Sequence, residues 1–342
     1  MGAARPRQSA LRQRQNRAEK RMVRPICQGR SFPTRRKTAN ANPVWRGVAP
    51  ARSKAYDRKR EENGMTVEKQ QTRQTRNYEF YSAQYSRFSS ILASDIRREA
   101  YGEDLGQQGW RTLGEQQEII RLVNERPQAR LLDVACGSAG PSIAIAAATG
   151  CRLTGVDIEQ AAIEQAKIIA AGAHLPDKAT FAVADCSQPL PFGAGEFDVI
   201  SCIDAIIHLT DRRTVFADWF RLLTPGGRLI LTDACVLTGD ISKEELDIRA
   251  SQGKFHLVPA GFNEGMLEGA GFELLSCKDT TDAVASLAMR LCRARESRRE
   301  ALLKEEEAGW FENRQTFLST TAELAATARL SRFLYIAEKP QL

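Results

Sequence analysis

The chain has 342 residues, of which 42% are hydrophobic, and a formal net charge of +7. This length and composition support one large or two ordinary domains with a sizeable core, which excludes a wholly disordered protein. No apolar run reaches the roughly 18 residues that a membrane-spanning helix needs, and the N-terminus lacks the hydrophobic core of a signal peptide, so we expect a cytoplasmic protein without membrane contact.

The positive charge is concentrated at the N-terminus. Residues 1–64 carry 18 Lys or Arg against 4 Asp or Glu, whereas the other 278 residues carry 31 basic and 38 acidic groups. This segment is too poor in periodic apolar residues to fold alone, so we expect a basic, disordered extension. Three roles stay open for it: a nucleic-acid-binding arm, an organelle transit peptide, or an extension without function, since Met65 directly follows.

The eight cysteines are spread along the chain, and no two form a CxxC pair. Most stand among apolar residues. We therefore expect reduced thiols in the core or in pocket walls, rather than a disulfide framework or a metal site.

Residues 65–125 form a predicted helical cap. Aromatic and apolar residues recur along "YEFYSAQYSRFSSILASDI" (78–96), as in an amphipathic helix. Most of these rings are expected to be the core of the cap itself. Some, Tyr85 among them, are candidates to close over a ligand and to face a cationic or aromatic substrate in the catalytic site.

Residues 126–342 alternate short apolar runs with helical patterns, which predicts an α/β, Rossmann-like fold with a seven-stranded, mostly parallel sheet and helices on both faces. The predicted strands are 130–136, 151–158, 179–186, 197–204, 226–236, the second half of 262–279, and 331–339. The predicted helices are 141–150, 159–173, 211–223 and the first half of 262–279. A charged insertion at 282–330 predicts further helices, which commonly form a lid over a ligand crevice.

Ligands of open parallel sheets bind beyond the carboxyl ends of the strands. There the first strand runs into "LLDVACGSAG" (131–140), and the second ends at Asp157, 24 residues after Asp133. The small residues let a backbone turn approach a ligand closely, and a carboxylate in the second position suits ribose hydroxyls. Taken alone, Ala135-x-Gly137-x-x-Gly140 also matches a degenerate dinucleotide motif, so an NAD-dependent dehydrogenase is an alternative.

Four stretches in the expected order resemble the motifs of class I S-adenosylmethionine-dependent methyltransferases: "LLDVACGSAG", "GVDI", "VADCSQPLPFGAGEFDVISCIDAIIHL" and "LLTPGGRLILTD". The resemblance covers roughly residues 120–275 and the last strand. It implies S-adenosylmethionine as the cofactor. The glycine-containing stretch 101–110 is similar to the loop that seals the cofactor in small-molecule members.

The resemblance also implies which residues bind the cofactor. Asp133 orients the turn, and the backbone around Ala135 and Gly137 holds the methionine end, which Ile203 also lines. Asp157 binds the ribose, Ile158 packs on the adenine, and the end of the third strand contacts the adenine edge. The full set is Asp133, Ala135, Gly137, Gly140, Asp157, Ile158, Asp185, Cys186 and Ile203. Ala135 and Ala139 depart from the family, which often has Gly there.

The residues after the fourth strand supply the candidate catalytic groups. An ammonium or hydroxyl acceptor must lose a proton, and His208 follows Asp204 by four residues in "IDAIIHLTD". Asp204 is expected to orient His208 or to hold a cationic acceptor. The stretch is similar to that of phosphoethanolamine and sarcosine/dimethylglycine methyltransferases, where a histidine assists proton removal. The alternative is that His208 only packs between sheet and helix.

We therefore expect an enzyme that transfers a methyl group from S-adenosylmethionine to oxygen or nitrogen of a small molecule. The first alternative is an RNA-directed methyltransferase that uses the basic arm, although the acidic remainder of the chain argues against nucleic acid as a partner. A protein that binds the cofactor without turnover is a further possibility. The sequence leaves the acceptor and the oligomeric state open.

Overall fold

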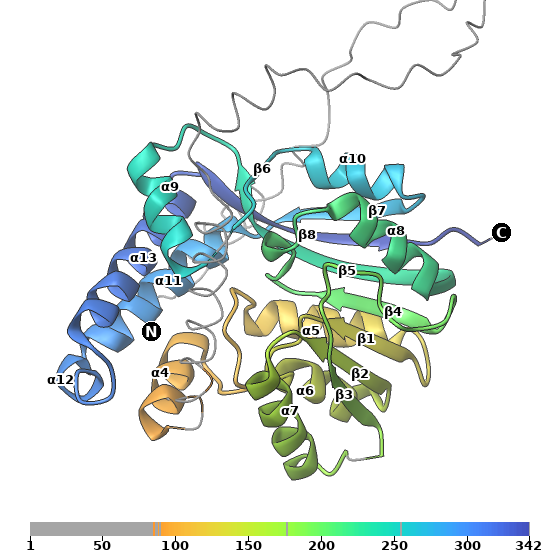
Figure 1. Cartoon of the computed structure of the whole chain (residues 1–342), viewed down its shortest axis with the longest axis horizontal. Helices are drawn as coiled ribbons and strands as arrows, with labels where there is room; N and C mark the ends of the chain where they lie inside the picture. The colour runs from red at the N-terminus through yellow and green to blue at the C-terminus, as the bar shows by residue number, and fades with distance from the viewer. Residues whose placement is uncertain (1–84, 86–87, 89, 176, 254, 342) are drawn as a thin grey trace, which may run out of the picture. The chain divides into compact units, whose positions relative to one another are not determined.

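The computed structural model describes residues 85, 88, 90–175, 177–253 and 255–341. The predicted basic extension 1–64 and the first part of the predicted cap, residues 65–84, lie outside these ranges. Within them the chain forms one mixed sheet flanked by helices, with an additional group of helices beside it (Figure 1).

The sheet has the strand order β3-β2-β1-β4-β5-β8-β7, and β6 pairs with β5 outside this path. Its strands are β1 (Arg130–Val134), β2 (Arg152–Asp157), β3 (Ala179–Val183), β4 (Phe197–Cys202), β5 (Leu223–Leu237), β6 (Val258–Pro259), β7 (Glu273–Asp279) and β8 (Leu330–Glu338). Strands β1 to β5 are parallel, and β8 is antiparallel to both β5 and β7. The predicted α/β, mostly parallel sheet is confirmed. The two-residue β6 was not predicted, because so short a strand has no periodicity.

Helices cover both faces of the sheet. On one face lie α5 (Leu113–Asn124), α6 (Gly140–Thr149) and α7 (Gln160–Gly172), and on the other lie α8 (Arg212–Leu222) and α10 (Phe262–Gly269). Strand β1 shows why its sequence is almost continuously apolar. Leu131 packs into the core under α5 and α6, and Leu132 packs into the core under α8, so both faces of the strand are buried.

The remaining helices form a third hydrophobic core. It joins α4 (Ile91–Tyr101), α11 (Thr281–Glu296) and α13 (Ala308–Ala326), while α12 (Arg299–Leu302) connects the last two. The helix α9 (Lys243–Arg249) follows β5 and packs on α13. The predicted cap therefore divides within the described residues: α4 packs with the 281–326 helices, whereas α5 packs on α6 and the sheet.

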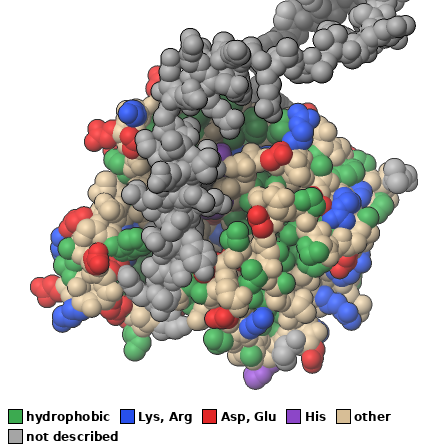
Figure 2. Space-filling model, in the orientation of Figure 1, with side chains coloured by type: hydrophobic (Ala, Val, Ile, Leu, Met, Phe, Trp, Pro, Cys, Tyr) green, Lys and Arg blue, Asp and Glu red, His purple; other side chains and the backbone are tan. Residues whose placement is uncertain are grey.

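The described surface carries charges of both signs. On the face shown in Figure 2, acidic and basic side chains are interspersed. In the described ranges, no helix is both long enough and apolar enough to cross a bilayer.

Candidate functional site

The turn between β1 and α6 has an unusual backbone. Ala135, Gly137 and Ala139 have φ angles of 54°, 57° and 54°, in the left-handed region. Glycine adopts this region freely, whereas a Cβ atom makes it costly by about 1 kcal/mol or more. The two alanines therefore hold a backbone conformation that glycine normally adopts.

The small residues of this turn also make room for another part of the chain. A Cβ atom on Gly140 would lie 1.6 Å from the carbonyl oxygen of Leu105, and one on Gly137 would lie 2.5 Å from the hydroxyl of Tyr85. The Ser138 hydroxyl donates to the carbonyl of Gly106 at 3.1 Å. The 101–110 loop thus lies directly against the turn, and Tyr85 lies over it.

Asp157, at the end of β2, bridges the turn and α7. Its Oδ2 accepts the N–H of Gly137 at 2.8 Å, and its Oδ1 accepts the N–H of Glu159 at 2.9 Å. Burial raises the pKa of this carboxyl above its usual value. A carboxylate has about four lone-pair sites, so each oxygen retains capacity for one further donor, as two vicinal hydroxyls require.

Apolar and polar groups flank Asp157 at the ends of β2 and β3. Ile158 is 62% exposed and Val183 is 48% exposed, which is unusual for aliphatic side chains beside a core. Asp185 is exposed, and its Oδ1 accepts the N–H and the hydroxyl of Ser187. Cys186 is buried, and burial raises the pKa of its thiol to about 12. The arrangement suits an apolar ring system with a polar edge.

Asp133 is buried and ties three elements together. Its carboxylate accepts the hydroxyls of Ser142, on α6, and Ser201, on β4, the latter at 2.8 Å. Burial raises the pKa of this carboxyl. These contacts fix the start of α6 against the ends of β1 and β4.

Asp204 belongs to a buried charge network. Its carboxylate accepts the backbone N–H of Trp110 at 2.7 Å, the Thr232 hydroxyl at 3.0 Å and the Nε of Arg332 at 2.7 Å. Arg332 also binds both carboxylate oxygens of Glu115, at 2.7 and 2.8 Å. The structure therefore does not place the Asp204 carboxylate against His208. Its contacts join the end of β4 to β5, to β8 and to the residues just before α5.

His208 lies in a short 3-10 turn, Ile206–His208, just after β4. Its ring is half-buried, and its centroid is 5.3 Å from that of Phe255. The N–H of His256 donates to the carbonyl of Ile207 at 2.7 Å, which holds the 255–257 segment against this turn. Ile203, immediately after β4, packs against the α5–α6–α7 core.

Sequence reasoning missed the arginines of this region. Arg332 is completely buried in β8. The one sequence feature that could have indicated its role is the presence of a basic residue inside the apolar strand "SRFLYIAE". Arg111 stands one residue beyond the stretch 101–110 that resembles the cofactor-sealing loop. Phe255 gave no signal, because its place opposite His208 depends on how the chain returns after β5.

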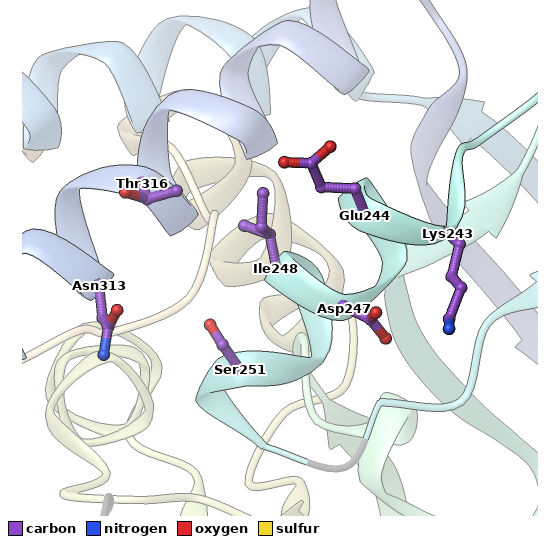
Figure 3. Close-up of a pocket in the computed structure, with 7 residues that line it drawn as sticks. All are labelled: Lys243, Glu244, Asp247, Ile248, Ser251, Asn313 and Thr316. Atoms are coloured by element: carbon purple, nitrogen blue, oxygen red, sulfur yellow. The ribbon is translucent and has the colours of Figure 1, made fainter.

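A groove of about 560 Å³ lies elsewhere, between α9 and α13. In Figure 3, Ile248 projects from α9 toward α13, and Asn313 and Thr316 line the other side. None of the predicted site residues lines it. Across residues 85–341, leaving out the gaps in description, no group of three or more His, Cys, Asp or Glu side chains is placed to hold a metal ion.

Several known methyltransferases are similar to this chain. Residues 132–231 match the family model described as "Methyltransferase domain". The chain is 28% identical over 261 residues to the 27-O-demethylrifamycin SV methyltransferase of Amycolatopsis mediterranei, an alignment that covers 73% of this chain and 90% of that protein. It is 31% identical over 170 residues to phosphoethanolamine N-methyltransferase 1 of Zea mays, covering 50% of this chain but only 33% of that protein.

Solved structures share the fold. A putative sarcosine dimethylglycine methyltransferase from Galdieria sulphuraria superposes with a TM-score of 0.59 at 19% identity, covering 67% of this chain and 84% of that one. The phosphoethanolamine N-methyltransferase 2 of Haemonchus contortus, bound to phosphomonomethylethanolamine and S-adenosylhomocysteine, superposes with a TM-score of 0.64 at 19% identity, covering 77% of this chain and 60% of that one. At these identities the likeness concerns the fold.

Proposed function

Because this chain belongs to the S-adenosylmethionine-dependent methyltransferases, we propose that it transfers the methyl group of that cofactor to an oxygen or nitrogen atom of a small-molecule acceptor. The observation that carries the proposal is the convergence of the 135–140 turn, Asp157 and the 185–186 segment at one edge of the sheet. Such an edge is where open α/β sheets bind their ligands.

The residues at this edge fit the cofactor. Asp157 has two lone pairs available for the ribose hydroxyls, and the exposed Ile158 offers an apolar face to the adenine. The Oδ2 atom of Asp185 accepts no hydrogen bond from the described residues and is available to the adenine amino group. The backbone of Ala135 and Gly137 would hold the methionyl part, while Gly140 acts indirectly by admitting the Leu105 carbonyl.

S-adenosylmethionine supplies an electrophilic methyl group on a sulfonium, and in-line transfer mainly requires a positioned nucleophile in a dry pocket. His208 is the candidate base that takes the proton from an attacking hydroxyl or ammonium. Its ring faces Phe255, which limits water on that side. Tyr85 is a further candidate to contact the acceptor. Its hydroxyl lies over Gly137, in the turn that would hold the methionyl part of the cofactor.

Asp204 acts as a positioning residue in this proposal. Both of its carboxylate oxygens are occupied by Trp110, Thr232 and Arg332, so its charge is balanced within the protein. A cationic acceptor would have to displace Arg332, which is completely buried. Asp204 instead holds the end of the 101–110 loop against β4.

The relatives favour neither the NAD-dependent dehydrogenase nor the RNA-directed methyltransferase. They include a 27-O-demethylrifamycin SV methyltransferase, whose alignment covers 73% of this chain, and phosphoethanolamine N-methyltransferases. Neither a dehydrogenase nor an RNA-directed enzyme is among these matches. We propose that the acceptor is held between the strand ends and the helices α4, α11 and α13, whose shared core includes Trp110.

Calorimetric titration tests the cofactor. We expect the full chain to bind S-adenosylhomocysteine and not NAD. Asp157→Ala should weaken the binding of S-adenosylhomocysteine by about 1 to 3 kcal/mol, through loss of charge-assisted hydrogen bonds. Glu164→Ala, on an exposed part of α7, is the control and should leave the affinity unchanged. Binding of NAD alone would overturn the proposal.

A further inference from the structure

Several arginines of the described part lie over a phenylalanine ring and also bind a carboxylate. The ion pairs are Arg97–Asp104, Arg212–Asp233, Arg295–Glu306 and Arg299–Glu312. The ring face attracts the cation but offsets only part of the cost of removing it from water. In these four pairs, the carboxylate balances the remaining charge.

Arg249, the last residue of α9, has no such partner among the described residues. Its side chain is completely buried, with Cζ 4.7 Å from the centroid of the Phe317 ring and 5.4 Å from that of Phe255. Its Nη atoms donate to the Thr321 hydroxyl at 2.8 Å and to the Cys235 sulfur at 3.5 Å, whereas its Nε has no partner there. Burial raises the pKa of the Cys235 thiol to about 11, so this sulfur stays neutral.

The buried carboxylate of Asp233, two residues before Cys235 on β5, is occupied by other groups. Its Oδ2 accepts from Arg212 at 2.7 Å and from the Asn263 amide at 2.9 Å, and its Oδ1 accepts the N–H of Cys235 at 2.8 Å. Arg212 and Asp233 thus balance each other, and the charge of Arg249 stays unbalanced. A buried cation is costly unless an anion completes its site.

A second cation, Arg314 of α13, lies over the same Phe317 ring. Its side chain is half-buried, its Cζ is 5.3 Å from the ring centroid, and its Nη1 donates to Gln252 Oε1 at 3.1 Å. The Tyr101 hydroxyl, which donates to the carbonyl of Gly109 at 2.8 Å, is within electrostatic range of it. Burial raises the pKa of Tyr101, and the charge of Arg314 opposes that rise. Arg314 therefore extends the positive charge from Phe317 toward the 101–110 loop.

The half-buried ring of Phe255 connects this charge to the candidate base. Its centroid is 5.3 Å from that of the His208 ring and 5.4 Å from Arg249 Cζ. The base and the buried cation are therefore at most about twice this distance apart. A single aromatic ring with a hydrogen-bonding group at each end spans such a length.

We propose that the acceptor is a small aromatic acid, a planar ring that carries a hydroxyl and a carboxylate. The inference rests on the proposed function and narrows its acceptor. The ring packs on Phe255, and the carboxylate binds the planar fork of Arg314, with the charge of Arg249 behind the two phenylalanines. The hydroxyl proton passes to His208 as the oxygen bonds to the methyl carbon and the carbon–sulfur bond breaks. The products are a methyl ether of the acid and S-adenosylhomocysteine.

Calorimetric titration of the full chain, saturated with S-adenosylhomocysteine, tests the acceptor. The probes are the three isomers of hydroxybenzoate and their methyl esters, which keep the ring and the hydroxyl but lose the negative charge. Sarcosine and phosphoethanolamine supply an anionic group without a ring. We expect at least one isomer to bind about 10-fold or more tightly than its ester and than both aliphatic compounds, because a charge-assisted hydrogen bond distinguishes the acid.

Arginine variants test which residues make this distinction. Arg314→Gln should weaken the binding of that acid by about 10- to 100-fold and of its ester by less than about 3-fold, and Arg314→Lys should be intermediate. Arg249→Met removes the buried charge and should act in the same direction. If it fails to fold, the half-buried Arg314 carries the test. Arg299→Gln is the matched control, because Arg299 lies over Phe311 at 4.7 Å but binds Glu312.

The outcomes separate this inference from the proposed function. If the unmodified chain does not bind S-adenosylhomocysteine, the cofactor assignment itself fails. If it binds S-adenosylhomocysteine but the esters or the aliphatic compounds bind as tightly as the acids, the inference is wrong. It is also wrong if Arg314→Gln weakens acid and ester equally, since Arg314 then serves folding alone. A loss confined to the acid, with Arg299→Gln unchanged, supports it.

Discussion

Ala135 and Ala139 show how single residues strain the turn that carries the site. Both have φ angles of 54°, where glycine would be unstrained. Ala139 is completely buried, so its methyl group also contributes packing, whereas Ala135 is only partly buried. The energetic cost of the departure from the family pattern is therefore clearest at Ala135.

We predict that Ala135→Gly raises the free energy of unfolding by about 0.5 to 1 kcal/mol. Relief of the left-handed strain outweighs the greater conformational entropy that glycine brings to the unfolded chain. Chemical denaturation measures the difference. Ala147→Gly, at an exposed position of α6, should have the opposite sign, because glycine lowers helix stability by about 1 kcal/mol. Equal effects at both positions would contradict this account.

His208 is the candidate base for the proposed chemical step. With an acceptor identified by a screen of amines and phenols, His208→Ala should lower kcat by about 10²- to 10⁴-fold, because proton removal loses its base. The affinity for S-adenosylhomocysteine should not change. His174→Ala is the control, since His174 is exposed after α7. Unchanged turnover of His208→Ala across the pH range would remove this histidine from the mechanism.

At the scale of elements, ion pairs fix both ends of the central strands. Arg130, at the start of β1, donates from Nε and Nη2 to Asp198, at the start of β4, at 3.0 and 2.9 Å. At the other end, Arg332 of β8 joins Asp204 and Glu115. The first pair is partly exposed and modest in strength, whereas the second is buried, so losing one partner there would leave a costly unpaired charge.

The Arg130–Asp198 pair predicts a pH dependence. Hydrogen bonds from Arg130 lower the pKa of Asp198 below its usual 3.8. A carboxyl with a lowered pKa stabilises the folded chain above its unfolded pKa and loses that contribution as the pH falls through the folded value. Asp198→Asn should therefore reduce the free energy of unfolding by about 0.5 to 1 kcal/mol at pH 7.

Comparing Asp198→Asn with the unmodified chain at several pH values provides the control. Below about pH 4 the difference between Asp198→Asn and the unmodified chain should shrink, because Asp198 itself becomes protonated. Urea denaturation at pH 7, 5 and 3 measures it. A difference that stays constant over this range would mean that the pair contributes through packing alone.

At the scale of the whole molecule, the basic segment and the remainder of the chain have opposite net charge. The proposed site is built from residues of the described part. Removing residues 1–64 should therefore leave the calorimetric affinity for S-adenosylhomocysteine within about 2-fold of the full chain, a difference below about 0.4 kcal/mol.

An RNA-directed enzyme would behave differently. Truncation would then abolish methyl transfer, and binding of RNA by the full chain would fall steeply with salt as counterions are released. A titration with single-stranded RNA at two salt concentrations, with and without residues 1–64, separates the two functions. Equal activity of both chains on a small molecule would support the proposal.

Local sequence determined the order of strands and helices, the turn after β1 and the carboxylate at the end of β2. These features depend on periodicity of 2 or 3.6 residues and on short spacings, which a sequence displays directly. Seven of the eight strands and the helices on both faces were predicted in this way. Asp133 and Asp157 lie where the motif spacing placed them.

Only the tertiary structure decided how distant residues meet. Asp204 pairs with Arg332, 128 positions later, and Gly140 is covered by Leu105 from the loop before α5. Such contacts depend on the packing of β8, α5 and the 101–110 loop at one edge of the sheet, and no local spacing encodes them. The contacts of Asp204 follow from that packing, because the partners of a charge inside a protein are its neighbours in space.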